Sequence, residues 1–242
     1  MKHWAISTLL LLGVVALLQG QSKAEQLAAL QTISSSDDLR LLYSYYGDKP
    51  RPDLLGSSID YVASQRLCSN PSFEDRAIFF YGPVFSQMGD LSPYFGSRSK
   101  FGPNEQIVFS EVLHFANTKE SLALMNDIIA HCDSSAKDYL NRLKNLPPIE
   151  VMKIPVKSPE TLDVLWQGFF AAHEPKYVLR IAKALEKNMS DISSIMLAGA
   201  ARQSLQANAV DYPVIRTILK ENEGIFSESA REDVETIANG GQ

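Results

Sequence analysis

The chain of 242 residues lacks the short motifs that mark several common enzyme classes. No two glycines stand in a Gly-x-Gly arrangement and no Gly-Lys-Ser/Thr occurs, which excludes dinucleotide fingerprints and phosphate-binding loops. Gly-x-Ser-x-Gly, Cys-x-x-Cys and Cys-x-x-Cys-His are also missing, which excludes the hydrolase elbow, thioredoxin chemistry and c-type haem attachment. We therefore expect no cofactor.

Basic residues are few and are not clustered. The chain has 23 Lys and Arg against 28 Asp and Glu, a net charge of −5. Loss of Lys2 and Lys23 with the N-terminal segment described below would leave 21 basic residues and a net charge of −7. Because proteins bind nucleic acid by neutralising phosphates with a basic stripe, we expect no nucleic-acid partner.

Cysteine is scarce, with Cys68 and Cys132 the only two. In an oxidising compartment this pair could form one disulfide, which would close a loop of about 65 residues and stabilise the fold by about 4 kcal/mol. Two free thiols that pack as small hydrophobic side chains are the alternative. The sequence leaves both open.

The four histidines do not predict a metal centre. Glu111 and His114 share one helix face, which is half of what a di-iron bundle needs, but neither His131 nor His173 has a glutamate three residues before it. The adjacent trio His131-Cys132-Asp133 would point in different directions on a helix. We therefore expect no metal site.

The first 24 residues have the three parts of a secretory signal peptide. Met1-Lys2-His3 is a short basic start, the run from Trp4 to Leu18 is apolar, and Ser22-Lys23-Ala24 places small residues before a cleavage point at Glu25. The apolar run is shorter than the ~20 residues that cross a bilayer. We expect export to the periplasm or the extracellular space, in the style of a bacterium, and no stable membrane insertion after cleavage.

From Ser158 onward, apolar residues recur with the period of a helix. Ser158-Pro159-Glu160 combines a cap, a first-turn proline and a carboxylate at the positive end of the helix dipole. The first stripe is Leu162, Leu165, Trp166, Phe169 and Phe170. Further helices are expected to begin at Pro175, at Ser190 or Asp191, at Pro213 and at Ser227, the third running through Ile192, Ile195, Met196, Gly199, Ala200 and Leu205.

The caps at Ser158, Asp191 and Ser227 are 33 and 36 residues apart. Paired antiparallel helices that recur at this interval are typical of tetratricopeptide-like repeats. The sequence therefore predicts a short α-solenoid in the C-terminal half.

Three segments between residues 158 and 222 carry a resemblance. They are the Leu-Trp-x-x-Phe-Phe sequence that starts at Leu165, the Tyr-Val-x-Arg-Ile sequence from Tyr177 to Ile181, and Ala200-Ala201-Arg202-x-Ser204-Leu205. Together they resemble uncharacterised exported bacterial helical-repeat proteins of tetratricopeptide-like type. The resemblance implies an all-α repeat fold and brings no catalytic residue with it. The first helix departs from the tetratricopeptide consensus because no glycine follows its tryptophan at the usual place.

The N-terminal half is also helical but less regular, and strand signals are nearly absent, so we expect an all-α fold of antiparallel helix pairs. Prolines from Pro147 to Pro159 interrupt the pattern, and Ile149–Val156 is expected to be extended. The predicted organisation is a helical domain over 25–144, a linker over 145–157 and a repeat domain over 158–242. The expected N-terminal helices are Asp37–Tyr46, Pro52–Cys68, Ser72–Tyr81, Pro103–Ala116, Thr118–Cys132 and Ser134–Leu143.

Aromatic residues gather between Phe73 and Phe115, and three of them fall in a segment rich in Gly, Pro and Ser over 82–102. These three, Tyr94, Phe95 and Phe101, either fold back into the N-terminal core or present aromatic anchors to a partner. The sequence allows both interpretations.

An exported bacterial protein could reach the cell wall, so enzymes that act on the cell wall are a class to compare with this sequence. Ser134-x-x-Lys137 and Ser97-x-x-Lys100 match the nucleophile pattern of penicillin-recognising enzymes, but the other motifs of that class are missing. Glu120-Ser121 resembles the catalytic Glu-Ser of helical lytic transglycosylases, whose Gly-Leu-Met-Gln segment is also missing. Under this alternative, Glu120 or Glu111 would be the general acid.

The function that we favour from sequence is binding of another protein or a peptide by an exported helical-repeat protein. The expected contact surface combines the loop that carries Tyr94, Phe95 and Phe101 with a face that carries Tyr177, Arg180 and Arg202. A glycan-cleaving periplasmic enzyme is the alternative, and a purely structural or assembly role is a third.

Overall fold

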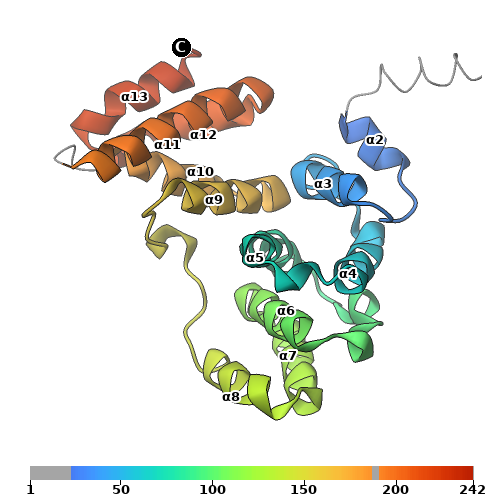
Figure 1. The fold of residues 1–242 in the computed structure, drawn as a ribbon. Coiled ribbons are helices and arrows are strands. Elements are labelled where there is room, and N and C mark those ends of the chain that lie inside the picture. The colour runs from blue at the N-terminus through green and yellow to red at the C-terminus, as the bar shows by residue number, and fades with distance from the viewer. Residues whose placement is uncertain (1–22, 187–190, 242) are drawn as a thin grey trace, which may run out of the picture.

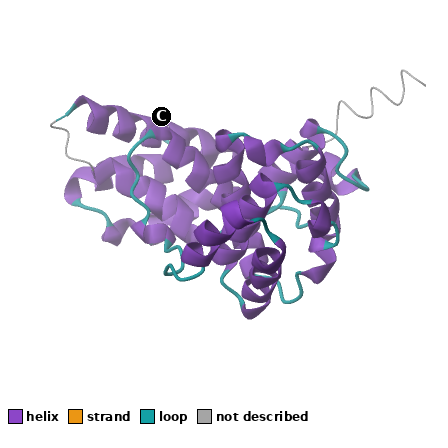
Figure 2. Ribbon diagram, turned by 60° about the horizontal axis from the view of Figure 1, so that its bottom comes forward, coloured by secondary structure: helices purple, strands orange, loops and turns teal. Residues whose placement is uncertain are grey.

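The computed structural model describes residues 23–186 and 191–241. The signal peptide expected over 1–24 lies outside these ranges, apart from Lys23 and Ala24. Within the described ranges every regular element is a helix (Figures 1 and 2), which confirms the all-α prediction.

The N-terminal half consists of seven α-helices and four short 3-10 turns within its described part. The α-helices are α2 (Lys23–Ala29), α3 (Ser36–Tyr45), α4 (Leu55–Ser64), α5 (Pro71–Ser86), α6 (Pro103–Ala116), α7 (Lys119–His131) and α8 (Ser134–Leu143). The 3-10 turns are η1 (Pro52–Leu54), η2 (Leu67–Ser69), η3 (Ser92–Phe95) and η4 (Arg98–Lys100).

The C-terminal half begins with the turn η5 and continues through helices of very different lengths. They are η5 (Val151–Lys153), α9 (Pro159–Ala172), α10 (Pro175–Ala182), η6 (Lys183–Glu186), α11 (Ile192–Asp211), α12 (Val214–Glu221), η7 (Glu223–Ile225) and α13 (Glu228–Ala238).

Local capping chemistry explains why several helices begin where the sequence predicts. Pro103 opens α6 and the side chain of Asp133 caps α8, accepting hydrogen bonds from two backbone N–H groups of its first turn. Asn117 ends α6 in the left-handed conformation, with a φ of 49°. Both helices have the bounds expected from sequence.

Helix α5 does not end at Tyr81, as the Gly82-Pro83 pair suggests, but continues to Ser86 with Pro83 inside it. Gly82 lies against the ring of Phe115 on α6, where a Cβ atom would stand 2.7 Å from two ring carbons. The continued turn buries further apolar side chains in the core, and this burial compensates for the backbone hydrogen bond that Pro83 cannot donate.

The proline-rich linker is not extended over Ile149–Val156. Val151 begins the turn η5, and both Val151 and Val156 are buried. The segment therefore packs on the protein instead of spanning between two bodies.

The hydrophobic core is continuous from one half of the chain to the other. Helix α9, on the C-terminal side of the linker, packs against α5 and α3 of the N-terminal side (Figure 1). The backbone N–H of Gly47, just after α3, donates to the carbonyl of Phe170 on α9 at 2.8 Å. The division into domains 25–144 and 158–242 stays a prediction, although apolar packing crosses the expected boundary.

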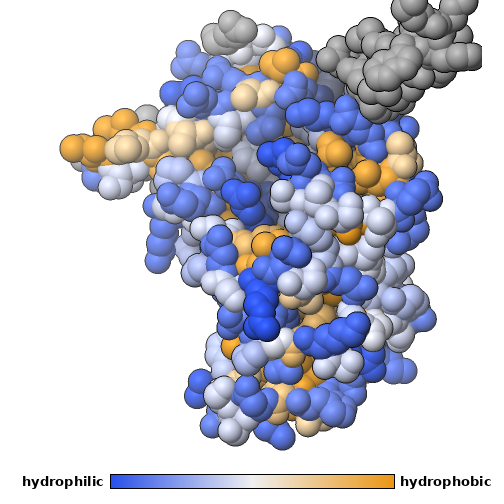
Figure 3. All heavy atoms as spheres, turned by 45° about the vertical axis from the view of Figure 1, so that its right-hand side comes forward, coloured by the Kyte–Doolittle hydropathy of each residue, from blue (hydrophilic) through white to orange (hydrophobic). Residues whose placement is uncertain are grey.

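The C-terminal helices do not confirm a solenoid. Helix α10 contacts both α11 and α12, and α11 contacts α9, α12 and α13. With 20 residues, α11 is much longer than the 8-residue helices α10 and α12, so the pairs are not equivalent repeats. Its first turns project at the left of Figure 1, and hydrophobic side chains gather on the same projection in Figure 3.

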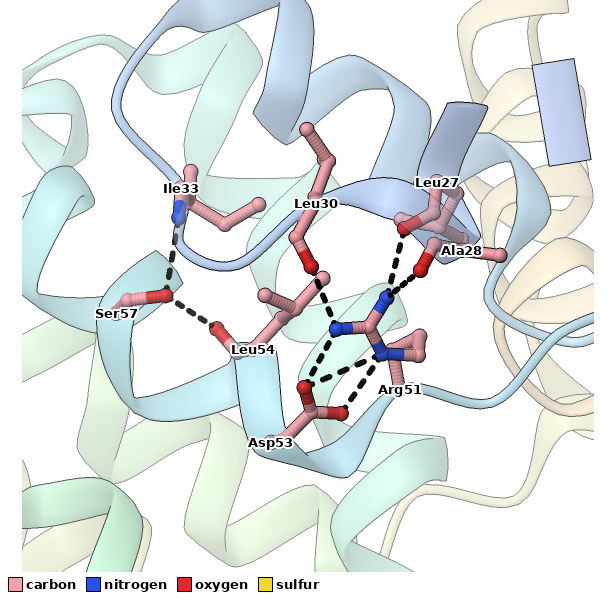
Figure 4. A network of polar contacts seen from close by, with 8 residues as sticks. All are labelled: Leu27, Ala28, Leu30, Ile33, Arg51, Asp53, Leu54 and Ser57. Atoms are coloured by element: carbon pink, nitrogen blue, oxygen red, sulfur yellow. Dashed lines mark hydrogen bonds and ion pairs between the residues drawn. The ribbon is translucent and has the colours of Figure 1, made fainter. Parts of the chain in front are cut away.

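Arg51 fastens the N-terminal helix α2 to the rest of the fold (Figure 4). Its Nη1 donates to the carbonyls of Leu27 at 2.9 Å and Ala28 at 2.7 Å, and its Nη2 donates to that of Leu30 at 2.6 Å. Asp53 pairs with the opposite edge of the guanidinium, with Nη2 to Oδ2 at 2.6 Å. Carbonyls at the C-terminal end of a helix have no intrahelical partner, and the Arg51 side chain binds two of them, of Leu27 and Ala28, together with that of Leu30 just after the helix.

Candidate binding surface

Helix α11 is almost uncharged along its whole length. Asp191 caps it, accepting a hydrogen bond from the N–H of Ser194 at 2.9 Å, and within its 20 residues only Arg202 and Asp211 carry charge. Apolar residues surround the helix on all sides instead of forming one stripe. A helix of this kind is expected to be covered by protein all round.

One face of α11 packs against the rest of the protein. At the side of this face Arg202 binds α13, with its Nε donating to Oδ1 of Asp233 at 2.9 Å. The side chains packed into the core are Leu197, Ala198, Ala201, Leu205 and Ala209, all 3% exposed or less.

The opposite face is bare. Ile192 is 77% exposed, Met196 66%, Val210 65% and Ile195 47%. Their spacing places them on one side of the helix, together with the small and amide residues between them. We refer to this row as the α11 stripe: Ile192, Ile195, Met196, Gly199, Gln203, Gln206, Ala207 and Val210.

The α11 stripe is uncharged throughout, and its most exposed apolar side chains stand toward its two ends, with Gln203 and Gln206 between them. Single exposed apolar side chains are normal on a protein surface, whereas contiguous apolar patches mark contact sites. From Ile192 to Val210 the stripe extends about 27 Å along the helix without a charged residue. Beside Gly199 no atom lies within 4 Å of the place where a Cβ would stand, so the middle of the stripe is open.

A hollow of about 460 Å³ adjoins the C-terminal end of the stripe. Its wall on α11 includes Ala207 and Val210, and the facing wall comes from Arg216 on α12, Ile237 on α13 and Gly240. The Nε of Arg216 is buried and has no hydrogen-bond partner within the described part of the chain. The stripe thus has projecting side chains at one end and a concave surface at the other.

The aromatic loop expected to offer anchors is folded into the core. Phe95 is fully buried and Phe101 is 6% exposed, and both pack against Phe109 of α6. Tyr94 is half-buried and stacks on Phe85. The alternative in which the loop packs into the core is confirmed, and the prediction that Phe95 and Phe101 form a contact surface is wrong.

The second predicted face also has structural roles. Tyr177 is fully buried beneath α9, so its prediction as a contact residue is wrong. Arg180 is half-buried and its Nε donates to the carbonyl of Ile154 at 2.7 Å. Arg202 is engaged by Asp233. These three side chains do not form a common exposed surface.

Two polar residues of the aromatic loop that the sequence did not single out, Arg98 and Ser99, line a cavity of about 490 Å³. Arg98 pairs with Asp127 of α7, with Nε to Oδ2 at 2.6 Å. His131 lies one turn further on, with its Nδ1 2.8 Å from the carbonyl oxygen of Asp127. Gln106 also lines this cavity.

A third cavity, of about 570 Å³, lies where α3, α9 and α11 end. Asp48 and His173 line it, with Oδ1 to Nε2 at 3.4 Å, together with Tyr45, Asp211 and Tyr212. Burial, followed by the charge of Asp48, raises the pKa of the Tyr212 hydroxyl above its ordinary value.

Glu111, one of the two acids predicted from the sequence, has a strongly raised pKa. Burial between helices and the neighbouring carboxylates Glu74 and Asp75 raise its pKa to about 7, although Tyr139 donates a hydrogen bond to it. Neither Glu111 nor Glu120 lines any of the three cavities described above, and Glu120 is exposed on the surface.

Both cysteines are free thiols in the structure, the arrangement of the second alternative left open by the sequence. Cys68 is buried, and desolvation raises the pKa of its thiol to about 12. Cys132 is half-buried and its Sγ donates to the carbonyl of Ile129 at 3.2 Å.

No group of three or more His, Cys, Asp or Glu side chains in the described ranges is arranged to hold a metal ion. None of the helices in those ranges combines the length and the hydropathy that a bilayer span requires. Comparisons of the chain with protein-family models, with curated proteins and with solved structures found no match.

The scarcity of charged residues in α11 is the one sequence feature that indicates the α11 stripe, and it is not a motif. Twenty consecutive helical residues with only two charges have too much apolar surface for one buried face. Helical periodicity placed Ile192, Ile195 and Met196 in line with Leu205, but the structure turns the first three to solvent and Leu205 to the core.

Proposed function

We propose that this protein is an exported scaffold that binds another protein chain through the α11 stripe. The observation that supports it is the exposure of Ile192, Met196 and Val210, each about two-thirds exposed or more, on one uncharged face. Apolar surface of this extent costs free energy in water, and a protein partner that covers it recovers that free energy.

The composition of the stripe fits an interface better than a small-molecule site. The centres of protein interfaces are depleted in charged residues and enriched in methionine, and Met196 lies among aliphatic side chains with no charge nearby on the stripe. The stripe extends about 27 Å and its most exposed side chains project into solvent, whereas small molecules bind in concave sites.

Export is the second part of the proposal, and it rests on the basic start, apolar run and small residues of positions 1–24. Fractionation of cells that produce the full chain tests it. We expect a processed species that begins near Glu25 in the periplasm or the medium. Recovery of the full-length chain from the cytoplasm would refute export without affecting the interface.

Charge placed on the stripe tests the interface. Met196→Asp adds one carboxylate at an exposed helical position, and Asn141→Asp on α8 adds the same group at an exposed position outside the stripe. Both variants should keep the helical circular dichroism of the parent. We expect Met196→Asp to lower the affinity for the protein partner at least tenfold and Asn141→Asp to leave that affinity unchanged. Equal affinity of the parent and both variants for the partner would refute the proposal.

A glycan-cleaving enzyme is a second candidate because of Glu111. Its pKa of about 7 would allow it to hold a proton at neutral pH, as a general acid must, and Glu74 offers a second carboxylate nearby. Release of soluble fragments from purified cell wall by the parent but not by Glu111→Gln would support this function. Equal release by both proteins, or none, would reject it.

A further inference from the structure

We infer that the partner of the α11 stripe is the α11 stripe of a second copy of the same chain, packed antiparallel about a twofold axis at Gln203. This inference rests on the proposed function and specifies its partner. It follows from the order of the residues along the stripe, from the shape of its two ends and from its lack of charge.

Two pairs of stripe residues lie at equal distances on either side of Gln203. Met196 lies seven residues before Gln203 and Val210 seven residues after it, and both are exposed and apolar. Gly199 and Ala207 lie four residues before and after. In a twofold antiparallel helix pair, residues at equal distances from the axis meet across the interface. Met196 therefore meets Val210 of the second copy, and Gly199 meets Ala207.

The pairing of small residues determines how closely the helices can approach. Gly199 has open space at its Cβ position and Ala207 is exposed, so neither holds the second helix away. Because a twofold axis repeats each contact, the close approach occurs on both sides of Gln203. The glutamine at the centre is suited to meet its own copy, since its amide offers both donors and acceptors.

The shapes of the two ends of the stripe are complementary. Ile192, Ile195 and Met196 project at the N-terminal end of α11, and the hollow beside Val210 lies at the C-terminal end. Antiparallel packing about Gln203 places Met196 of each copy over Val210 and the hollow beside it in the other copy. The same rotation fills both hollows, so the contact closes as a dimer and does not continue into a filament.

Electrostatics favour this face over others for self-association. The chain has a net charge of −5, so two copies repel each other at most orientations. A contact between identical surfaces brings like charges together wherever the surface is charged. The α11 stripe has no charged side chain, so it avoids this repulsion.

One helix pair provides a small interface, so we expect a dimer that dissociates on dilution, with a dissociation constant in the micromolar range. Disulfide trapping in the purified full-length chain tests its geometry. Gln203→Cys places identical thiols at the twofold axis, where mild oxidation should join them. The parent protein, in which Cys68 is buried and Cys132 is half-buried, shows how much crosslinking occurs without the added thiol.

Two further cysteine variants test the register. In the antiparallel pair the two Met196 positions lie about 21 Å apart along the helices, too far for a disulfide. Met196→Cys alone should therefore run as a monomer on gels without reducing agent. A mixture of Met196→Cys and Val210→Cys should form a disulfide-linked dimer of the two variants. Trapping of Met196→Cys with itself as fast as Gln203→Cys would overturn the antiparallel arrangement.

The failures of the two proposals can be told apart. If Gln203→Cys crosslinks no more than the parent while Met196→Asp still abolishes capture of a different protein, the dimer is wrong and the proposed function stands. If Met196→Asp changes neither self-association nor capture, both are wrong. If Gln203→Cys is trapped and Met196→Asp prevents association of the parent, both are supported.

Discussion

Gly168 of α9 lies directly against the ring of Tyr177 of α10. A Cβ atom at position 168 would stand 2.6 Å from Cδ1 of that ring and closer still to Cε1. The absence of a side chain at one residue is therefore what lets the two helices pack closely. It also explains why Tyr177 is part of the core, in a helix whose sequence suggested an exposed face.

Replacing Gly168 by alanine should force the Tyr177 ring to move, because the core has no free space for the methyl group. We expect Gly168→Ala to reduce the free energy of unfolding by about 2 kcal/mol, measured by urea denaturation. The Tyr177 hydroxyl is buried without a hydrogen-bond partner in the described ranges. Tyr177→Phe should therefore stay within about 0.5 kcal/mol of the parent. A Gly168→Ala variant as stable as the parent would show that this contact is not tight.

Arg51 should be the residue that keeps α2 in place. Arg51→Ala removes the charged donor from two carbonyls of α2 and from that of Leu30 just after it, and we expect a loss of about 2 kcal/mol in the free energy of unfolding. Amide hydrogen exchange in α2 should become faster. Arg40→Ala is the matched control, because Arg40 pairs with Asp37 at an exposed site and should contribute less than about 0.5 kcal/mol. Unchanged exchange in α2 after Arg51→Ala would contradict this role.

Glu111 should make stability depend on pH near neutrality. Its folded-state pKa of about 7 lies above the ordinary value of 4.5, so the folded state favours the protonated carboxyl. Its contribution to stability is present in full below pH 4.5 and is lost as pH rises through 7. Because the group is partly exposed, we expect a loss of about 2 kcal/mol between pH 5 and pH 8.

Glu111→Gln should remove most of this dependence, while Glu120→Gln, at an exposed position, should not change it. Urea denaturation of the three proteins at several pH values provides the comparison. Parallel pH profiles for the parent and Glu111→Gln would show that Glu111 titrates normally in the folded protein.

Local signals in the sequence predicted local structure well. The proline at position 103 and the acid at position 133 determine the starts of α6 and α8, since capping depends on residues within one turn. The Gly82-Pro83 pair wrongly predicted that α5 ends at Tyr81, because the outcome there depends on a residue far away in the sequence. Whether α5 continues through that pair depends on Phe115, which packs against it from another helix.

The candidate surface was harder to predict because α11 has apolar residues on every side. Periodicity identifies an apolar face, but it cannot tell which of two such faces meets the core. The buried positions of Leu197 and Leu205 and the exposed position of Met196 are set by how α9, α12 and α13 surround the helix. For the aromatic loop, composition was equally compatible with burial and exposure, and packing against Phe109 decided in favour of burial.

A photo-crosslinking amino acid at position 196 tests most directly whether the α11 stripe is a contact surface. In cells that produce the full chain, irradiation should join position 196 covalently to a protein, and mass spectrometry should place the bond near Val210 of a second copy. The same amino acid at position 141, exposed on α8, should give no adduct. No adduct at position 196, or equal adducts at both positions, would contradict the assignment of the α11 stripe as an interface.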